Sequence, residues 1–171
     1  MSEEQIAQWF SIVASVFIVF GYFSISDVRA KLILIVGCVL FAIHFYMLGA
    51  MTAMIINVVN IFRISLSIKF HKSQEIFILF IVLYLFVAVV TYDSWIDLLP
   101  VMASVTGCIA MFLFSGISFR LISVIGTVCW LVHNIYVFSI GGITTELFVL
   151  MAHMATIYRL IRREKLNDQT A

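Results

Sequence analysis

Polar side chains that could bind a solute or carry a proton lie within long apolar stretches of this 171-residue chain. Asn57 and Asn60 are three residues apart and therefore share one face of a helix. Steps of seven and three residues bring Glu146, His153 and Thr156 to nearly one side of a helix as well. Amides, hydroxyls and imidazoles hydrogen-bond to polar solutes, and His titrates near neutral pH. The candidate substrate-binding residues are Asn57, His153, Asn60, Thr156, Glu146, His44 and His133.

The composition requires a lipid bilayer as the solvent of these residues. Hydrophobic residues make up 64% of the chain and charged residues 11%, and the mean hydropathy is +1.16. Polar residues are too few to cover the surface of a water-soluble domain. The apolar runs are continuous rather than alternating, which favours helices over barrel strands. We therefore predict an all-α polytopic membrane protein. Its charged tail is too short and mixed for a nucleic-acid partner.

Seven apolar stretches have the length of a membrane span. A hydrocarbon core of roughly 30 Å needs about 20 helical residues, and the chain divides into pieces of that size. The expected spans are residues 6–24, 32–49, 50–68, 76–92, 98–115, 121–140 and 143–161.

The basic residues predict the orientation of these spans. All ten Lys and Arg residues fall in the segments after spans 1, 3 and 5, at the adjoining span ends, and in the C-terminal tail. Lys and Arg in short loops stay on the cytoplasmic side of a membrane. The N-terminus is therefore expected outside and the C-terminus in the cytoplasm.

Several intramembrane polar residues have a structural interpretation beside the functional one. Asn and Thr in membrane helices often only bridge neighbouring helices, a contact worth about 0.6 kcal/mol. We favour this structural interpretation for Asn60 and Thr156. For Asn57 the structural and the functional interpretation both remain open. Glu146 lies in the expected first turn of the last helix, where the helix dipole stabilises a carboxylate. Glu146 could therefore be a helix cap or a proton carrier.

The histidines and arginines near helix ends also have two interpretations. His44 and His133 lie about one turn from the expected outer ends of their helices, where they could contact a ligand or hydrogen-bond at the wet membrane boundary. For Arg63 and Arg159, near the inner ends, we favour a structural role. Their stems would cover apolar surface while the guanidinium groups reach lipid phosphates.

No pattern typical of an enzyme or a metal centre is present. The chain lacks H-E-x-x-H, G-x-S-x-G and Walker motifs, and it has no pair of His residues at i, i+4. Cys38, Cys108 and Cys129 lie inside expected spans without C-x-x-C spacing, so they are interpreted as packing residues. We predict that the protein is not an enzyme and has neither a cofactor nor a metal.

The chain contains an internal repeat. Residues 13–45 align without a gap with residues 102–134, and about ten of some 33 positions are identical, including His44 with His133. Further along, the offset grows from 89 to 96, so that Asn57 meets His153 and Arg63 meets Arg159. If the two repeats are related by an axis along the membrane normal, Asn57 and His153 oppose each other near the midplane.

The repeat predicts a 3+1+3 arrangement. A unit of three helices reverses its sidedness, so a fourth helix must carry the chain back before a second parallel unit can start. The expected units are residues 1–69 for the first repeat, 70–97 for the connector with helix 4, 98–163 for the second repeat, and 164–171 for a cytoplasmic tail.

Four short motifs resemble a known family. They are HFYMLG at 44–49, DLLP at 97–100, CWLVHN at 129–134 and SIGG at 139–142, the last followed by Glu146. Together they resemble the YgjV-type bacterial inner membrane proteins, which are grouped with the SWEET, PQ-loop and nicotinamide-riboside transporter folds. The resemblance extends from residue 8 to about residue 163. SWEET and PQ-loop proteins carry prolines in both repeats, whereas this chain has only Pro100, at a helix start.

The resemblance implies a multi-pass protein of the bacterial inner membrane. The polar residues and the SWEET-like repeat predict a transporter or carrier of a small polar metabolite, with a polar site at the midplane between the repeats, and the analogy with such transporters suggests a homo-oligomer. The alternative is a non-transporting receptor, chaperone or scaffold whose polar residues only hold helices together. A packed interface without a hydrated cavity would favour that alternative.

Overall fold

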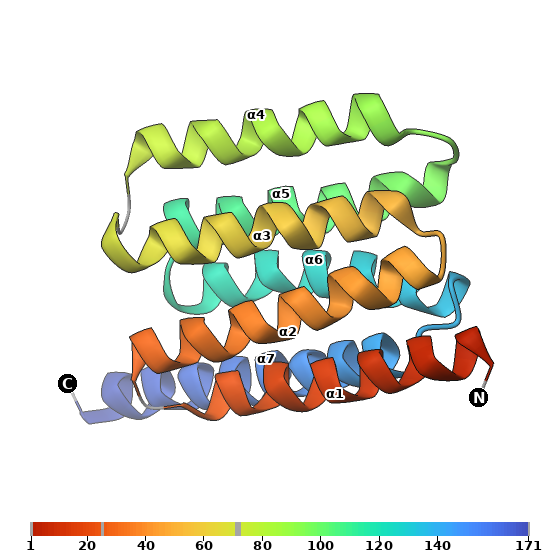
Figure 1. The fold of residues 1–171 in the computed structure, drawn as a ribbon. Coiled ribbons are helices and arrows are strands. Elements are labelled where there is room, and N and C mark those ends of the chain that lie inside the picture. Colours follow the sequence, from red (N-terminus) through yellow and green to blue (C-terminus); the bar gives the residue numbers. More distant parts are fainter. Residues whose placement is uncertain (1, 25, 71–72, 171) are drawn as a thin grey trace.

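The residues that the structure describes fold into a bundle of seven long helices (Figure 1). The computed structural model describes residues 2–24, 26–70 and 73–170. The elements are α1 (Glu3–Phe23), α2 (Asp27–Met47), α3 (Met51–Lys69), α4 (Gln74–Thr91), the short 3-10 helix η1 (Trp95–Asp97), α5 (Leu98–Leu113), α6 (Gly116–Tyr136) and α7 (Ile140–Thr170). All seven long helices are apolar enough to cross a membrane, and the described residues form no strand. The predicted all-α polytopic fold is confirmed.

Local hydrogen bonds explain where several helices begin and end. Ser2 and Gln5 form a capping box, in which each side chain accepts a hydrogen bond from the backbone of the other. The Ser73 hydroxyl accepts a hydrogen bond from the backbone N–H of Ile76 at the start of α4. Gly116, the first residue of α6, has a φ of 59°, which a residue with a side chain rarely adopts. These caps satisfy backbone groups that the helix itself leaves free.

Three helices differ most in extent from the hydropathy-based expectation. The second begins at Asp27 rather than at 32, the sixth begins at Gly116 rather than at 121, and the seventh begins at Ile140 and continues to Thr170. Hydropathy locates the part of a helix that lies in hydrocarbon. The helix itself can continue into the polar boundary, because its backbone hydrogen bonds are made within the helix whatever its side chains are.

The helices pack in the same order in both halves of the chain. In the first half α2 packs between α1 and α3, and in the second half α6 packs between α5 and α7. The halves meet where α1 contacts α7 and where α3 contacts α5. Helix α4 lies against α3 and α5 at one edge of the bundle (Figure 1). If the two repeats are related by a twofold axis, α1 corresponds to α5 and α3 corresponds to α7. The α1–α7 contact is then equivalent to the α3–α5 contact.

Large apolar side chains cover the outside of the bundle. Val89 on α4 is 81% exposed, and Phe86 and Met151 are each 63% exposed. Such a surface is unstable in water and suits the hydrocarbon of a bilayer. The protein therefore contacts lipid directly.

Small residues set the closest helix contacts. A Cβ added at Gly37 would meet the Ile18 side chain at 2.6 Å and would lie 3.5 Å from the carbonyl oxygen of Ala14, and one added at Gly126 would lie 3.0 Å from the carbonyl oxygen of Ala103. The two glycines, like the two alanines, are 89 positions apart in the repeat alignment. Without a hydrophobic driving force between helices, membrane bundles depend on such close backbone approach.

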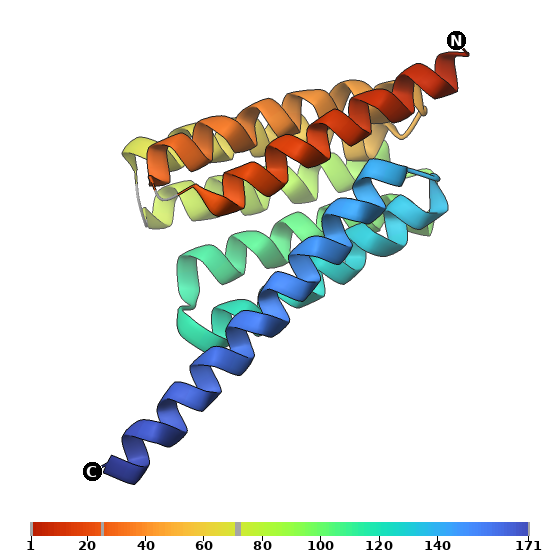
Figure 2. The ribbon, with the colours of Figure 1, turned by 90° about the horizontal axis from the view of Figure 1, so that it is seen from below.

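The tightest contact joins the two halves at one end of the bundle. A Cβ added at Gly141 on α7 would overlap the backbone of Ser11 on α1. From this contact α1 and α7 diverge toward the end of the bundle where the C-terminus lies (Figure 2). The halves are therefore closed at the end with the N-terminus and separate toward the other.

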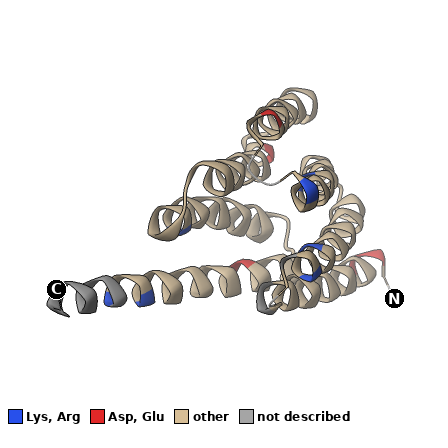
Figure 3. Ribbon diagram, turned by 90° about the vertical axis from the view of Figure 1, so that its left-hand side faces the viewer, with Lys and Arg blue, Asp and Glu red and all other residues tan. Residues whose placement is uncertain are grey.

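Seen from the end where the halves separate, the ribbon carries Lys and Arg positions on several helices (Figure 3). Because successive helices run in opposite directions, this end carries the start of α2 and α6 and the last turns of α3 and α7. The described side chains there include Arg29, Lys31, Lys69, Arg120, Arg159 and Arg162. The structure thus keeps the segregation of charge on which the predicted orientation depends.

Replacing Gly141 by Ala should lower the free energy of unfolding by about 1–3 kcal/mol, because the new methyl group forces α1 and α7 apart. Thermal unfolding of the purified protein in detergent measures the effect. Gly107→Ala is the matched control, since nothing lies within 4 Å of its added Cβ. Equal stability of the two variants would contradict the close approach of α1 and α7.

Candidate functional site

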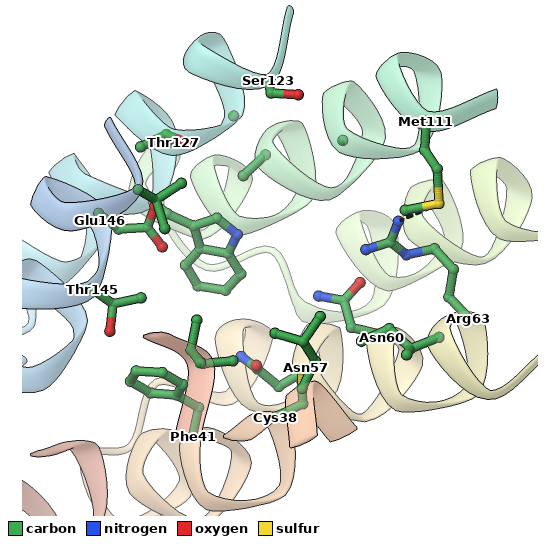
Figure 4. Close-up of a pocket in the computed structure, with 18 of the residues that line it drawn as sticks. Cys38, Phe41, Asn57, Asn60, Arg63, Met111, Ser123, Thr127, Thr145 and Glu146 are labelled. Atoms are coloured by element: carbon green, nitrogen blue, oxygen red, sulfur yellow. Dashed lines mark hydrogen bonds between the residues drawn. The ribbon is translucent and has the colours of Figure 1, made fainter. Parts of the chain in front are cut away.

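A cavity of about 320 Å³ lies between the two halves of the bundle. Residues of every long helix except α4 line it, so it opens within the membrane-spanning part of the protein. Its apolar wall includes Phe41, Phe45 and Ile64, and many polar side chains also face it (Figure 4). The polar and charged residues of the lining are Asn57, Asn60, Arg63, Arg120, Ser123, Thr127, Trp130, Asn134, Thr145, Glu146 and His153.

The two asparagines of α3 both line the cavity, as their shared helix face predicts. The Asn57 side-chain amide donates a 2.9 Å hydrogen bond to the carbonyl oxygen of Ala53 on its own helix. Asn60 accepts a 2.7 Å hydrogen bond from the Tyr84 hydroxyl of α4 through its Oδ1. Asn60 thus bridges two helices, but its Nδ2 makes no hydrogen bond with a described residue. Both asparagines therefore keep a free polar atom for a ligand.

His153 lines the cavity beside Arg120, which is not among the candidate binding residues of the sequence. Its Nδ1 lies 3.4 Å from Nη1 of Arg120 on α6. Because a guanidinium only donates hydrogen bonds, Nδ1 is the acceptor. The Arg120 guanidinium also lies 5.2 Å from the centre of the Phe119 ring, a cation–π distance.

Glu146 faces the cavity without a partner. Its side chain points into the space between the halves (Figure 4), and it forms no hydrogen bond or ion pair with a described residue. The interpretation of Glu146 as a first-turn cap is wrong, because α7 begins at Ile140 and places it in the second turn. A carboxylate that caps nothing is available to a solute or a proton.

The position of Arg63 contradicts a second expectation, namely that its guanidinium group reaches lipid phosphates. Its side chain lines the cavity (Figure 4) instead of reaching outward to lipid phosphates, and Nη1 lies 3.9 Å from Sδ of Met111 on α5. Its Nε is buried without a hydrogen-bond partner. The spacing contained a signal, because Arg63 follows Asn60 by three residues and so extends the polar face of α3. Arg63 was nevertheless expected to reach lipid phosphates, because it lies near the inner end of its helix.

The structure places the other three predicted residues outside this lining. The Thr156 hydroxyl donates to the carbonyl oxygen of Ala152, one turn back on α7. His133 is 1% exposed, packs against the rings of Phe45 and Trp130, and has no hydrogen-bond partner at Nδ1. No contact supports a role in substrate binding for these two residues.

His44 joins three parts of the bundle. Its Nδ1 lies 2.7 Å from the carbonyl oxygen of Ala7 on α1, and its Nε2 lies 2.8 Å from the hydroxyl of Ser139 before α7. Since a carbonyl only accepts, Nδ1 is the donor, and in the neutral ring Nε2 accepts from Ser139. His44 therefore holds α1 and the α6–α7 turn to α2.

Further hydrogen bonds cross directly between α1 and α7 at the same end. The Ser15 hydroxyl donates to the carbonyl oxygen of Gly141 at 2.6 Å, and the Thr145 hydroxyl donates to Ser15 Oγ at 2.8 Å. Gln8 donates to the carbonyl oxygen of Phe138 at 2.7 Å and accepts from the backbone N–H of Ile140 at 3.0 Å. We call these bonds, with the Gly141–Ser11 contact, the α1–α7 clasp. Thr145 belongs to both the clasp and the cavity lining, so the clasp bounds the cavity on this side.

Comparison with known proteins agrees with the motifs. The sequence model of a family described as bacterial inner membrane proteins, Imp-YgjV, matches residues 5–164. The chain belongs to the YgjV family. It is 27% identical to the inner membrane protein YgjV of Escherichia coli K12 over 165 residues, which are 96% of this chain and 90% of that protein. No solved structure matches the chain.

Membership of the YgjV family confirms the predicted resemblance and the location in the bacterial inner membrane. Among the residues that the structure describes, no group of three or more His, Cys, Asp or Glu side chains could hold a metal ion.

His44→Leu should destabilise this YgjV-family protein by about 1–2 kcal/mol, because it leaves the Ala7 carbonyl and the Ser139 hydroxyl without their partner. His133→Leu is the matched control at the equivalent repeat position, where Nδ1 has no partner to lose. Thermal unfolding in detergent compares them. A larger loss for His133→Leu would contradict a bridging role of His44.

Proposed function

We propose that the protein is a transporter or carrier of a small polar metabolite, which binds in the cavity between the two halves. The observation that carries this proposal is the cavity itself. Polar and ionisable groups are costly within a bilayer and usually mark a solute pathway when they face a shared space. Here Asn57, Arg63, Arg120, Glu146 and His153 face one space from three helices.

The packing of the two halves supports the predicted 3+1+3 arrangement. Equivalent small residues mediate the α1–α2 and α5–α6 contacts, and the α1–α7 and α3–α5 contacts are partners under the same relation. In transporters built from parallel repeats the substrate site lies at the repeat interface near the bilayer midplane. A cavity between the halves, with Asn57 and His153 on opposite halves, supports a site of this kind.

The closed and open ends of the bundle support alternating access. The α1–α7 clasp closes the end with the N-terminus, while the halves diverge at the basic end (Figure 2). By the positive-inside rule the basic end is cytoplasmic, so this conformation would face inward. The clasp consists largely of hydroxyl, amide and backbone groups, which water can replace if the halves rock apart at the outer side.

The same observations weigh against a receptor, chaperone or scaffold. A protein whose polar residues only held helices together would pair them with one another across a closed interface. Instead Glu146 has no partner among the described residues, and Nε of Arg63 is buried without one. Polar groups without a partner are costly inside a membrane protein, and a bound solute that hydrogen-bonds to them explains their presence better than a structural role does.

Access to Asn57 from both sides of the membrane tests the proposal without knowledge of the substrate. In a protein whose three cysteines are replaced by Ala, Asn57→Cys should react with a membrane-impermeant charged thiol reagent from the C-terminal face. Alternation between states predicts a slower but measurable reaction from the N-terminal face also. Labelled protein from oriented vesicles is quantified by mass spectrometry.

Two further variants control this measurement. Glu4→Cys marks the N-terminal face, and Val58→Cys, one residue from Asn57 but on the exposed lipid-facing side of α3, should stay unlabelled. Reaction of Asn57→Cys from neither face would show packed helices and favour the scaffold. Reaction from one face alone would leave a binding pocket without transport.

A further inference from the structure

We infer that the cavity binds a small organic anion, whose carboxylate or phosphate group is held between Arg63 and Arg120. The inference rests on the cavity of the proposed function and names the class of its solute. Arg63 comes from α3 in the first half and Arg120 from α6 in the second, so an anion between them touches both halves.

Neither guanidinium has a counter-ion in the part of the chain that the structure describes. Nη1 of Arg63 contacts the sulfur of Met111, and Nη1 of Arg120 contacts the neutral acceptor nitrogen of His153. Arg63 also keeps a buried Nε without a partner. An unpaired cation inside a bilayer is costly, and a planar guanidinium matches the two oxygens of a carboxylate or phosphate. We therefore assign the negative charge that would balance the two guanidinium groups to a bound ligand.

Other free donors line the same space. Asn60 uses its Oδ1 to accept from Tyr84 and leaves its Nδ2 unbonded, and the indole N–H of Trp130 makes no hydrogen bond with a described residue. Two guanidiniums, an amide and an indole N–H together form a surface rich in donors. The complementary chemical group is an acceptor that carries negative charge.

Among the described residues of the lining, Glu146 is the only acidic one, against two arginines. It lies across the cavity from Arg63 (Figure 4), so it does not neutralise that guanidinium. Its carboxylate is placed to accept a hydrogen bond from a hydroxyl at the other end of the solute. A hydroxylated organic anion thus satisfies both ends of the cavity.

Matched pairs of solutes test this inference on the wild-type protein. Gluconate is compared with glucose, and glycerol 3-phosphate with glycerol, at equal ionic strength in a thermal-stability assay in detergent. The anion of at least one pair should raise the unfolding temperature, and its neutral partner should not. The two pairs also separate a preference for carboxylate from one for phosphate. Equal shifts within each pair, or no shift with either anion, would overturn the inference.

Substitution of the arginines tests the site directly. Arg63→Gln and Arg120→Gln should each raise the Kd of the bound anion about 10- to 100-fold, the loss expected for one charged hydrogen-bonding partner. Arg159→Gln is the matched control, because Arg159 is the repeat equivalent of Arg63 but is exposed and does not line the cavity. An unchanged Kd in both cavity variants would overturn the assignment. If a variant fails to fold, the comparison of anionic and neutral solutes on the wild-type protein still tests the inference.

The outcomes separate this inference from the transport proposal. If anions bind through Arg63 and Arg120 but Asn57→Cys reacts from one face alone, the anion site stands and transport is overturned. If Asn57→Cys reacts from both faces while anions and neutral solutes behave alike, alternating access stands and the anion site is overturned.

Discussion

The bilayer cannot hydrogen-bond to the protein, and this constraint governs every level of the structure. It requires the backbone to form helices, since only they and closed barrels satisfy all peptide groups within the hydrocarbon. It also requires each intramembrane polar side chain to find a partner inside the bundle or a polar space. Ser15, His44, Asn60 and Thr145 find partners on other helices or on the turn before α7. Glu146 and Nε of Arg63 do not, and both side chains line the space where we place the solute.

Close packing of small residues gives the bundle its shape. Gly37 against Ala14 and Gly126 against Ala103 hold neighbouring helices together within each half, where lipid supplies no hydrophobic driving force. Between the halves such a contact occurs at one end, where Gly141 meets Ser11. Since α1 and α7 diverge from that point, the remaining interface cannot close completely. One tight crossing thus accounts for both the closed end and the cavity.

The differences between the repeats are as informative as their similarity. Arg63 points into the cavity, whereas its equivalent Arg159 is exposed. His44 forms two hydrogen bonds to other parts of the bundle, whereas His133 lies buried among aromatic rings with an unpartnered Nδ1. Similar backbones with unlike side chains produce a cavity whose two sides differ in charge and hydrogen-bonding capacity. An unsymmetrical solute requires such a site.

The sequence alone determined the membrane class, the number of spans, the segregation of basic residues, the shared face of Asn57 and Asn60, and the family. These features depend on hydropathy and helical period, which are local properties of the chain. The position of Glu146 in the cavity lining, the inward direction of Arg63 and the bridging role of His44 required the tertiary structure. They depend on how helices cross, and the crossing of α1 and α7 is set by a contact between Ser11 and Gly141, residues 130 positions apart. Local periodicity predicts which face of a helix is polar, but only packing decides what that face meets.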